Sequence, residues 1–267
     1  MKVGIVQMNT QDDKAANLAV ATKLIEKIAT QEGADLIVLP EYYAFLGSDP
    51  QSARDSAETP PEGDAYRTMS ALAARLDVTI HAGSIVEKDG NSFYNTTYVF
   101  GPDGREIARY RKIHLFDVDV PGGESYRESD MVGRGDEVVT YQVAGRTVGC
   151  SICYDLRFPE LFRALRDKGA EVIVLPAAFT LMTGKDHWEV LLRARAIETQ
   201  CWVLASAQVF SHAGGKKACY GHSMVIDPWG QVTAMVPDMV GTASATLDFD
   251  RLATIRTKLP VANHHVL

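Results

Sequence analysis

Two nearly identical apolar segments constrain the fold of this chain more than any other feature. They are Gly33-Ala34-Asp35-Leu36-Ile37-Val38-Leu39-Pro40 and, starting 136 residues later, Gly169-Ala170-Glu171-Val172-Ile173-Val174-Leu175-Pro176. A short apolar run bounded by glycine and proline is typical of a buried strand. Its recurrence at such a distance indicates that a whole structural unit occurs twice.

The order of the expected elements agrees with a repeat. Each half reads as strand, helix, strand, helix, strand, strand. For the first half we expect strands at 2–8, 33–41, 78–86, 93–100 and 106–112, helices at 12–30 and 64–76, and a loop over 46–63. For the second half we expect strands at 148–152, 169–176, 203–207 and 224–226, and helices at 159–166 and 187–199.

Two sheets that each carry helices on one face would bury their bare faces against each other. The chain is therefore predicted to adopt an α/β fold, a four-layer α-β-β-α sandwich with an internal pseudo-two-fold repeat. It would form a single domain over residues 1–267.

Composition excludes several classes of function. The net charge of -7 and the pI near 5.5 argue against a nucleic-acid-binding surface. No stretch approaches 18 consecutive apolar residues, so we expect no membrane partner. The 4 cysteines in 267 residues are too few for a disulfide scaffold. We expect a cytoplasmic protein.

Three residues with reactive side chains follow the ends of expected strands, where sites collect in α/β folds: Glu41, Lys112 and Cys153. A thiol needs a base at neutral pH, and burial behind Pro40 would make Glu41 a stronger one. Lys112 would favour the thiolate and then stabilise an oxyanion. The backbone N–H of Tyr154 is a natural second oxyanion donor.

The residues alone leave other interpretations open. Cysteines are often buried as small hydrophobes, and Glu41 and Lys112 read equally well as solvated charges. Cys150-x-x-Cys153 resembles a redox pair, but its three-residue offset places the two side chains on opposite faces of a strand. A zinc site would need more ligands at close spacing. Gly149-x-Ser151-x-Cys153 lacks the second glycine of a serine nucleophile elbow.

Three segments resemble the signatures of the nitrilase (carbon–nitrogen hydrolase) superfamily. They are Leu39-Pro40-Glu41, the run from Tyr110 to Asp117, and the run from Gly149 to Glu160. The resemblance implies a Glu-Lys-Cys triad with Glu41 as base, Lys112 as oxyanion stabiliser and Cys153 as nucleophile. It covers the whole chain in the right order and implies the same four-layer sandwich.

Further segments resemble the Nit branch, most closely its deaminated glutathione amidases and next its ω-amidases. They are 187–200 and 220–230. The resemblance makes Glu128 a second active-site glutamate that positions the lysine. It also implies that Arg157 binds the carboxylate of an α-keto acid and that Phe179 and Thr183 line the pocket. A structural ion pair with Asp155 or Glu160 is the alternative for Arg157. The loop 122–125 departs from the family pattern.

These observations predict an amidase that hydrolyses the side-chain amide of a small α-keto acid amide through a cysteine thioester, with no cofactor and no metal. Deaminated glutathione is the first expected substrate and 2-oxoglutaramate the second. An N-carbamoyl hydrolase, a nitrilase and a non-enzymatic scaffold are the alternatives. We also expect at least a homodimer, paired through the apolar side of the helix after Cys153, which carries Phe158, Leu161, Phe162 and Leu165.

Overall fold

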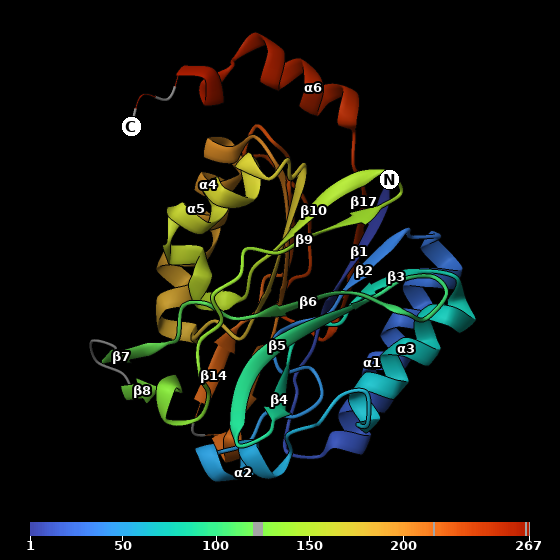
Figure 1. Cartoon of the computed structure of the whole chain (residues 1–267), viewed down its shortest axis with the longest axis vertical. Helices are drawn as coiled ribbons and strands as arrows, with labels where there is room; N and C mark the ends of the chain where they lie inside the picture. The colour runs from blue at the N-terminus through green and yellow to red at the C-terminus, as the bar shows by residue number, and fades with distance from the viewer. Residues whose placement is uncertain (120–124, 216, 265, 267) are drawn as a thin grey trace.

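The structure is a computed structural model that describes residues 1–119, 125–215, 217–264 and 266. It is a mixed α/β fold in which two main sheets lie between two groups of helices (Figure 1). No helix in the described ranges is long and apolar enough to cross a membrane.

The first main sheet has the strand order β17-β1-β2-β3-β5-β4, with β6 paired to β5. Its strands are β1 (Lys2–Gln7), β2 (Leu36–Val38), β3 (Thr79–His81), β4 (Ile85–Asp89), β5 (Ser92–Phe100), β6 (Glu106–Arg111) and β17 (Gly241–Thr246).

The second main sheet has the order β16-β15-β12-β11-β10-β9. Its strands are β9 (Thr140–Val143), β10 (Arg146–Cys150), β11 (Val172–Ala177), β12 (Trp202–Ala207), β15 (Met224–Ile226) and β16 (Val232–Met235). Two antiparallel pairs lie apart from the main sheets: β7 (Asp117–Asp119) with β8 (Ser125–Arg127), and β13 (Val209–His212) with β14 (Lys217–Tyr220).

Both sheets repeat one pairing scheme. In the first sheet β1, β2 and β3 are parallel and β5 is antiparallel to β3. In the second sheet β10, β11 and β12 are parallel and β15 is antiparallel to β12. The two apolar segments that repeat in the sequence therefore occupy the same place in each sheet, as β2 and β11.

The longer helices cover the outer faces of the sheets. Helices α1 (Lys14–Lys27) and α3 (Asp64–Leu76) pack on the first sheet, and α4 (Pro159–Asp167) and α5 (Leu181–Thr199) pack on the second (Figure 1). The other helical segments are α2 (Pro50–Asp55), α6 (Phe249–Lys258), the π-helical turn η1 (Ile28–Glu32) and the 3₁₀ turns η2 (Glu128–Asp130), η3 (Cys153–Arg157), η4 (Ala213–Gly215) and η5 (Val261–His264).

Alternation along the strands divides the apolar residues between two cores. In β2, Leu36 and Val38 belong to the core shared with the second sheet, whereas Ile37 belongs to the core beneath α1 and α3. The shared core also contains Val148 of β10 and Val174 of β11. The strands are apolar on both faces because both faces are covered.

Several predicted boundaries were wrong. The predicted loop over 46–63 contains α2, which begins where Asp49 accepts a hydrogen bond from the backbone N–H of Ser52. The predicted strand over 78–86 is divided into β3 and β4. The predicted helix over 187–199 begins six residues earlier, at Leu181, because the short polar stretch before it continues the same turns. These errors arise where tertiary contacts override local pattern.

The break between β3 and β4 occurs at Gly83, where the backbone approaches Pro40 so closely that only glycine fits. Gly83 has φ +44°, and a Cβ built on it would lie 1.9 Å from the carbonyl oxygen of Pro40. The segment also binds the chain beside it, since Ser84 Oγ accepts a hydrogen bond from the backbone N–H of Tyr42 at 3.1 Å. Gly83 therefore sets the position of the turn that carries Glu41.

We expect Gly83→Ala to destabilise the protein much more than Gly90→Ala. Gly90 has φ +59° and no atom within 4 Å of its built Cβ, so its alanine variant pays mainly the left-handed backbone strain of about 1–2 kcal/mol. Gly83→Ala adds overpacking of about 1–3 kcal/mol. Urea denaturation measures both free energies of unfolding, and equal losses would contradict the close approach.

Candidate active site

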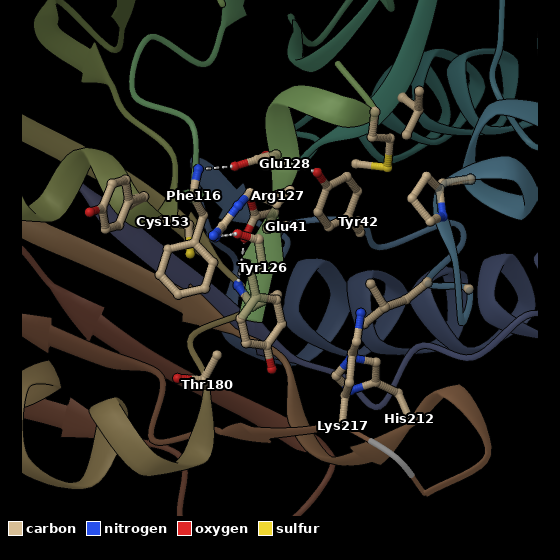
Figure 2. A pocket seen from close by; sticks show the side chains of 18 of the residues that line it. Glu41, Tyr42, Phe116, Tyr126, Arg127, Glu128, Cys153, Thr180, His212 and Lys217 are labelled. Atoms are coloured by element: carbon tan, nitrogen blue, oxygen red, sulfur yellow. Dashed lines mark hydrogen bonds between the residues drawn. The ribbon is translucent and has the colours of Figure 1, made fainter. Parts of the chain in front are cut away.

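Three strand ends bring the predicted triad together. Glu41 lies in the turn after β2, Lys112 directly follows β6, and Cys153 opens η3 three residues after β10. All three side chains line one cleft, and Figure 2 shows Glu41, Cys153 and Glu128 gathered at one side of it. The predicted proximity of Glu41, Lys112 and Cys153 is therefore what the structure shows.

Lys112 is a buried cation held by two carboxylates. Its Nζ lies 3.0 Å from Glu41 Oε1 and 2.8 Å from Glu128 Oε2, and its side chain is 2% exposed. Burial disfavours the charged form, but the charges of Glu128 and Glu41 outweigh burial and hold the pKa of Lys112 well above its ordinary value. Lys112 is therefore a permanent ammonium at neutral pH.

Glu128 is fixed by its own hydrogen bonds as well as by Lys112. Its Oε2 accepts from the backbone N–H of Phe116 at 2.7 Å, and its Oε1 accepts from the Tyr42 hydroxyl at 3.1 Å. Burial opposes its charge, yet Lys112, the Asn95 amide and the Phe116 backbone N–H keep the pKa of Glu128 below its ordinary value. Glu128 is thus a fixed anion beside the lysine, in the place that the family resemblance implied.

Two groups that the sequence analysis did not single out organise the carboxylates. Asn95 Nδ2 in β5 donates to Glu41 Oε1 at 2.8 Å and to Glu128 Oε1 at 3.0 Å. The backbone N–H of Ala178, just after β11, donates to Glu41 Oε2 at 2.8 Å. The only signal in the sequence was an asparagine within the buried run of β5, since a buried amide must find partners.

Cys153 adopts a backbone conformation that is costly for a residue with a side chain. Its φ is +47°, in the left-handed region, and its side chain is 7% exposed. Such strain collects at functional sites, where the surrounding structure holds it in place. The sequence pattern predicts Cys153 at the end of a strand, but β10 ends at Cys150 and Cys153 stands on the following turn.

Lys112 lowers the pKa of Cys153, as predicted, but it does not decide the protonation state of the thiol. Burial and the negative charge of Glu41, to which the thiol hydrogen-bonds, raise the pKa of Cys153 well above its ordinary value and outweigh the lowering effect of Lys112. Burial is the largest of these causes. Cys153 is therefore a neutral thiol that donates a hydrogen bond to the Glu41 carboxylate.

The cleft has a volume of about 330 Å³ and extends well beyond the triad. Tyr154, Phe179 and Thr183 line it, and the family resemblance implied this for Phe179 and Thr183. The Tyr154 ring packs edge-on against Phe116, with ring centroids 5.0 Å apart. The predicted role of the Tyr154 backbone N–H stays a prediction.

Arg157 is not among the residues that line the cleft, but it contacts one of them. Its guanidinium stands over the ring of Phe179, 5.2 Å from the centroid, and its Nη2 lies 3.2 Å from His187 Nδ1. Among the described residues it forms no ion pair with Asp155 or Glu160. Asp155 instead accepts from the Tyr110 hydroxyl at 2.7 Å and from the backbone of Ile152 at 2.8 Å. Arg157 thus keeps its charge available at the edge of the cleft.

Three further features were predicted from the sequence: a loop that departs from the family pattern, cysteines other than Cys153, and no metal. Residues 122–124 of the departing loop lie outside the described residues. The four cysteines are free and buried, and Cys150 faces the shared core. Within the described ranges no group of three or more His, Cys, Asp or Glu side chains could hold a metal ion.

Comparison with known proteins places this cleft in a family. The chain matches the carbon-nitrogen hydrolase family over residues 2–257. The chain belongs to that family, as its signature segments predicted. It is 41% identical over 266 residues to the deaminated glutathione amidase of Synechocystis sp., covering 98% of this chain and 96% of that protein.

Two other relatives of this carbon–nitrogen hydrolase are also similar to it over nearly its whole length. The omega-amidase NIT2 of Homo sapiens is 38% identical over 266 residues, covering 97% of this chain and 93% of that protein. The crystal structure of the C. elegans NitFhit protein superposes with a TM-score of 0.92 at 36% identity, covering 99% of this chain. The chain spans 64% of the length of that protein.

We expect Glu41→Gln to make Cys153 easier to ionise while abolishing hydrolysis. Removing the Glu41 charge removes a cause that raises the thiol pKa and leaves Lys112, so the thiolate should form at lower pH than in the wild type. Loss of a general base typically costs about 10²–10⁴ in rate. The pH dependence of iodoacetamide alkylation at Cys153, read by mass spectrometry, measures the pKa.

Glu58→Gln is the matched control, because Glu58 is also a buried glutamate but does not line the cleft. It should leave both alkylation and hydrolysis near the wild-type level. An alkylation profile that moved to higher pH in Glu41→Gln would refute the electrostatic account of the thiol.

Proposed function

We propose that this carbon–nitrogen hydrolase is an amidase that cleaves the side-chain amide of a small α-keto acid amide, with deaminated glutathione as the first candidate substrate. The observation that carries the proposal is the convergence of Glu41, Lys112 and Cys153 on one cleft. The named activities of relatives at 38–41% identity support the substrate class.

The contacts suggest how the thiol is activated. As Cys153 Sγ attacks the amide carbon, its proton passes to Glu41, which already accepts its hydrogen bond. The carbonyl π electrons move to oxygen, and the ammonium of Lys112 stabilises the resulting oxyanion. The Tyr154 backbone N–H is the proposed second donor. A neutral thiol with an adjacent base needs no preformed thiolate.

Glu128 explains why the site contains two glutamates. When Glu41 becomes protonated, Lys112 loses one of its two negative partners. Glu128, 2.8 Å away, remains ionised and keeps the lysine charged while the oxyanion forms. Breaking a buried pair otherwise leaves an uncompensated charge, which is strongly destabilising.

The second half of the cycle reverses these roles. Protonated Glu41 gives its proton to the leaving nitrogen as the C–N bond breaks, which leaves a thioester on Cys153. Glu41 then takes a proton from water, whose oxygen attacks the thioester carbon. Collapse of the second tetrahedral intermediate breaks the C–S bond, frees the carboxylic acid and returns the proton to the thiol.

Arg157, Phe179 and Thr183 are the proposed substrate-binding residues. Phe179 and Thr183 line the cleft, and the Arg157 guanidinium stands over Phe179 with no carboxylate partner in the described part of the chain. A small shift of Arg157 toward the cleft would allow a bidentate pair with an α-keto acid carboxylate.

A panel of amides tests the function. We expect wild-type protein to release an amine or ammonia from deaminated glutathione and from 2-oxoglutaramate, the ω-amidase substrate that is the second candidate. Nitriles and N-carbamoyl compounds should be poor substrates. Cys153→Ala should reduce turnover to traces, whereas Cys150→Ala, the matched control in the same segment, should keep most of it.

Retention of more than trace turnover by folded Cys153→Ala would eliminate Cys153 as the nucleophile. Faster hydrolysis of N-carbamoyl compounds than of any amide would favour an N-carbamoyl hydrolase, and faster hydrolysis of nitriles would favour a nitrilase. No turnover on the whole panel, with an unreactive Cys153, would favour the non-enzymatic scaffold.

We expect Arg157→Lys to lower kcat/KM selectively for amides that carry an α-keto acid carboxylate. A bidentate arginine–carboxylate pair is worth about 1.5–3 kcal/mol, or roughly ten- to hundredfold, and lysine lacks the planar fork. Amides without that carboxylate should lose much less. Equal losses on both kinds of amide would make Arg157 a structural residue.

We propose at least a homodimer, but not through the side of α4 that the sequence analysis chose. Leu161, Phe162 and Leu165 point into the protein and are at most 4% exposed. Helix α5, in contrast, carries exposed apolar side chains, with Val190 67% and Ile197 50% exposed. A light-scattering mass near the 29.2 kDa of one chain would exclude the dimer.

We propose that the layers seen in Figure 1 form a four-layer α-β-β-α sandwich and that residues 1–267 make one domain. The matched family segment and the two shared cores support this view. The cytoplasmic location stays a prediction from the sequence. The lack of nucleic-acid partners stays a prediction from net charge, and the lack of membrane partners stays a prediction from the absence of a long apolar stretch.

A further inference from the structure

The cleft holds more positive charge than the triad uses. Besides Lys112, the cations that line it are Arg127 and Lys217. Lys112 is matched by two carboxylates, and Arg127 pairs with Asp119 at 3.0 Å. Among the described residues, Lys217 has no ion pair. It is therefore the lining cation whose charge is available to a ligand.

Lys217 lies at the end of the cleft away from the nucleophile. Figure 2 shows Lys217 and His212 on one side of the pocket, with Cys153 and Glu41 on the other. The ammonium of Lys217 stands over the ring of Tyr126, 5.2 Å from its centroid. His212 faces Lys217 across the β13–β14 pair, and burial together with Lys217 lowers the pKa of His212 to about 4. At neutral pH the positive charge at this end comes from Lys217.

The path of the chain places Lys217 beyond the residues that hold the proposed base. Ala178, whose N–H holds Glu41, lies two residues before Thr180, and Thr180 pairs with Cys219 of β14. Lys217 lies two strand residues farther along β14, a step of about 7 Å. A group that reaches Lys217 from the scissile amide must therefore be longer than ammonia, and a leaving amine of two extended amino acids is about 7 Å long.

We propose that Lys217 binds a carboxylate at the far end of the leaving amine, so that the site prefers amides formed with amino acids or short peptides over simple primary amides. This inference rests on the proposed amidase function and deepens it. Arg157 and Lys217 would then recognise the two ends of one substrate, with the scissile amide at Cys153 between them. The Tyr126 ring would cover the ligand beside Lys217.

Three substrates separate this role from a structural one. Deaminated glutathione releases a dipeptide with a free carboxylate. Deaminated glutathione whose C-terminal carboxylate is converted to an amide releases a dipeptide without that charge, and 2-oxoglutaramate releases ammonia. We expect Lys217→Met to lower kcat/KM for the first by about tenfold, mostly through KM, as for loss of one charge-assisted hydrogen bond. The other two should change by less than about twofold, within the range of neutral surface changes.

Two further variants sharpen the result. Lys217→Arg keeps the charge and should recover most of the activity on deaminated glutathione. Lys168→Met, an exposed lysine that does not line the cleft, is the matched control and should leave all three substrates unaffected. Equal losses on the three substrates in Lys217→Met, or no loss on deaminated glutathione, would overturn the proposal.

A binding measurement keeps this test separate from the proposed function. If the wild type hydrolyses none of the three amides, the amidase proposal fails, but cysteinylglycine can still be tested as a ligand. Protection of Cys153 from iodoacetamide by cysteinylglycine in the wild type, and its loss in Lys217→Met, would support the Lys217 site. No protection, or equal protection in both proteins, would overturn it.

Discussion

The buried ammonium of Lys112 is the interaction on which the rest of the site depends. A charged lysine at 2% exposure is stable only if carboxylates and hydrogen bonds replace its lost hydration. Glu41 and Glu128 supply the charges, and Asn95 and the Ala178 N–H keep those carboxylates in place. Because these groups come from separate strands and turns, the site can form only when the sheets are assembled.

Burial and the same cluster set the protonation state of Cys153, the proposed nucleophile. Burial is the largest cause that raises the pKa of the thiol, and the charge of Glu41 is the next, so the thiol is neutral in the absence of substrate. The left-handed backbone at Cys153 and the close approach of Gly83 to Pro40 are locally unfavourable. The fold holds both of them where the thiol and Glu41 come together. Both features lie where strands end, on the loops that follow a rigid sheet.

The repeated sheet explains why these ends coincide. β2 and β11 occupy equivalent positions in the two sheets, and Glu41 follows the first while Ala178 follows the second. The hydrogen bond from Ala178 to Glu41 therefore joins the two halves of the repeat at the proposed base. The cleft extends from this junction to β14, where Lys217 lines it.

The sequence by itself determined the α/β class, the strands β2 and β11, the triad residues and the family, because apolar periodicity and short signature segments are local properties. Only the tertiary structure decided the neutral state of Cys153, the roles of Asn95 and Ala178, the inward side of α4 and the free charge of Lys217. Each of these depends on which groups from distant parts of the chain become neighbours. Charge balance and burial are sums over those neighbours, so no single segment of the sequence contains them.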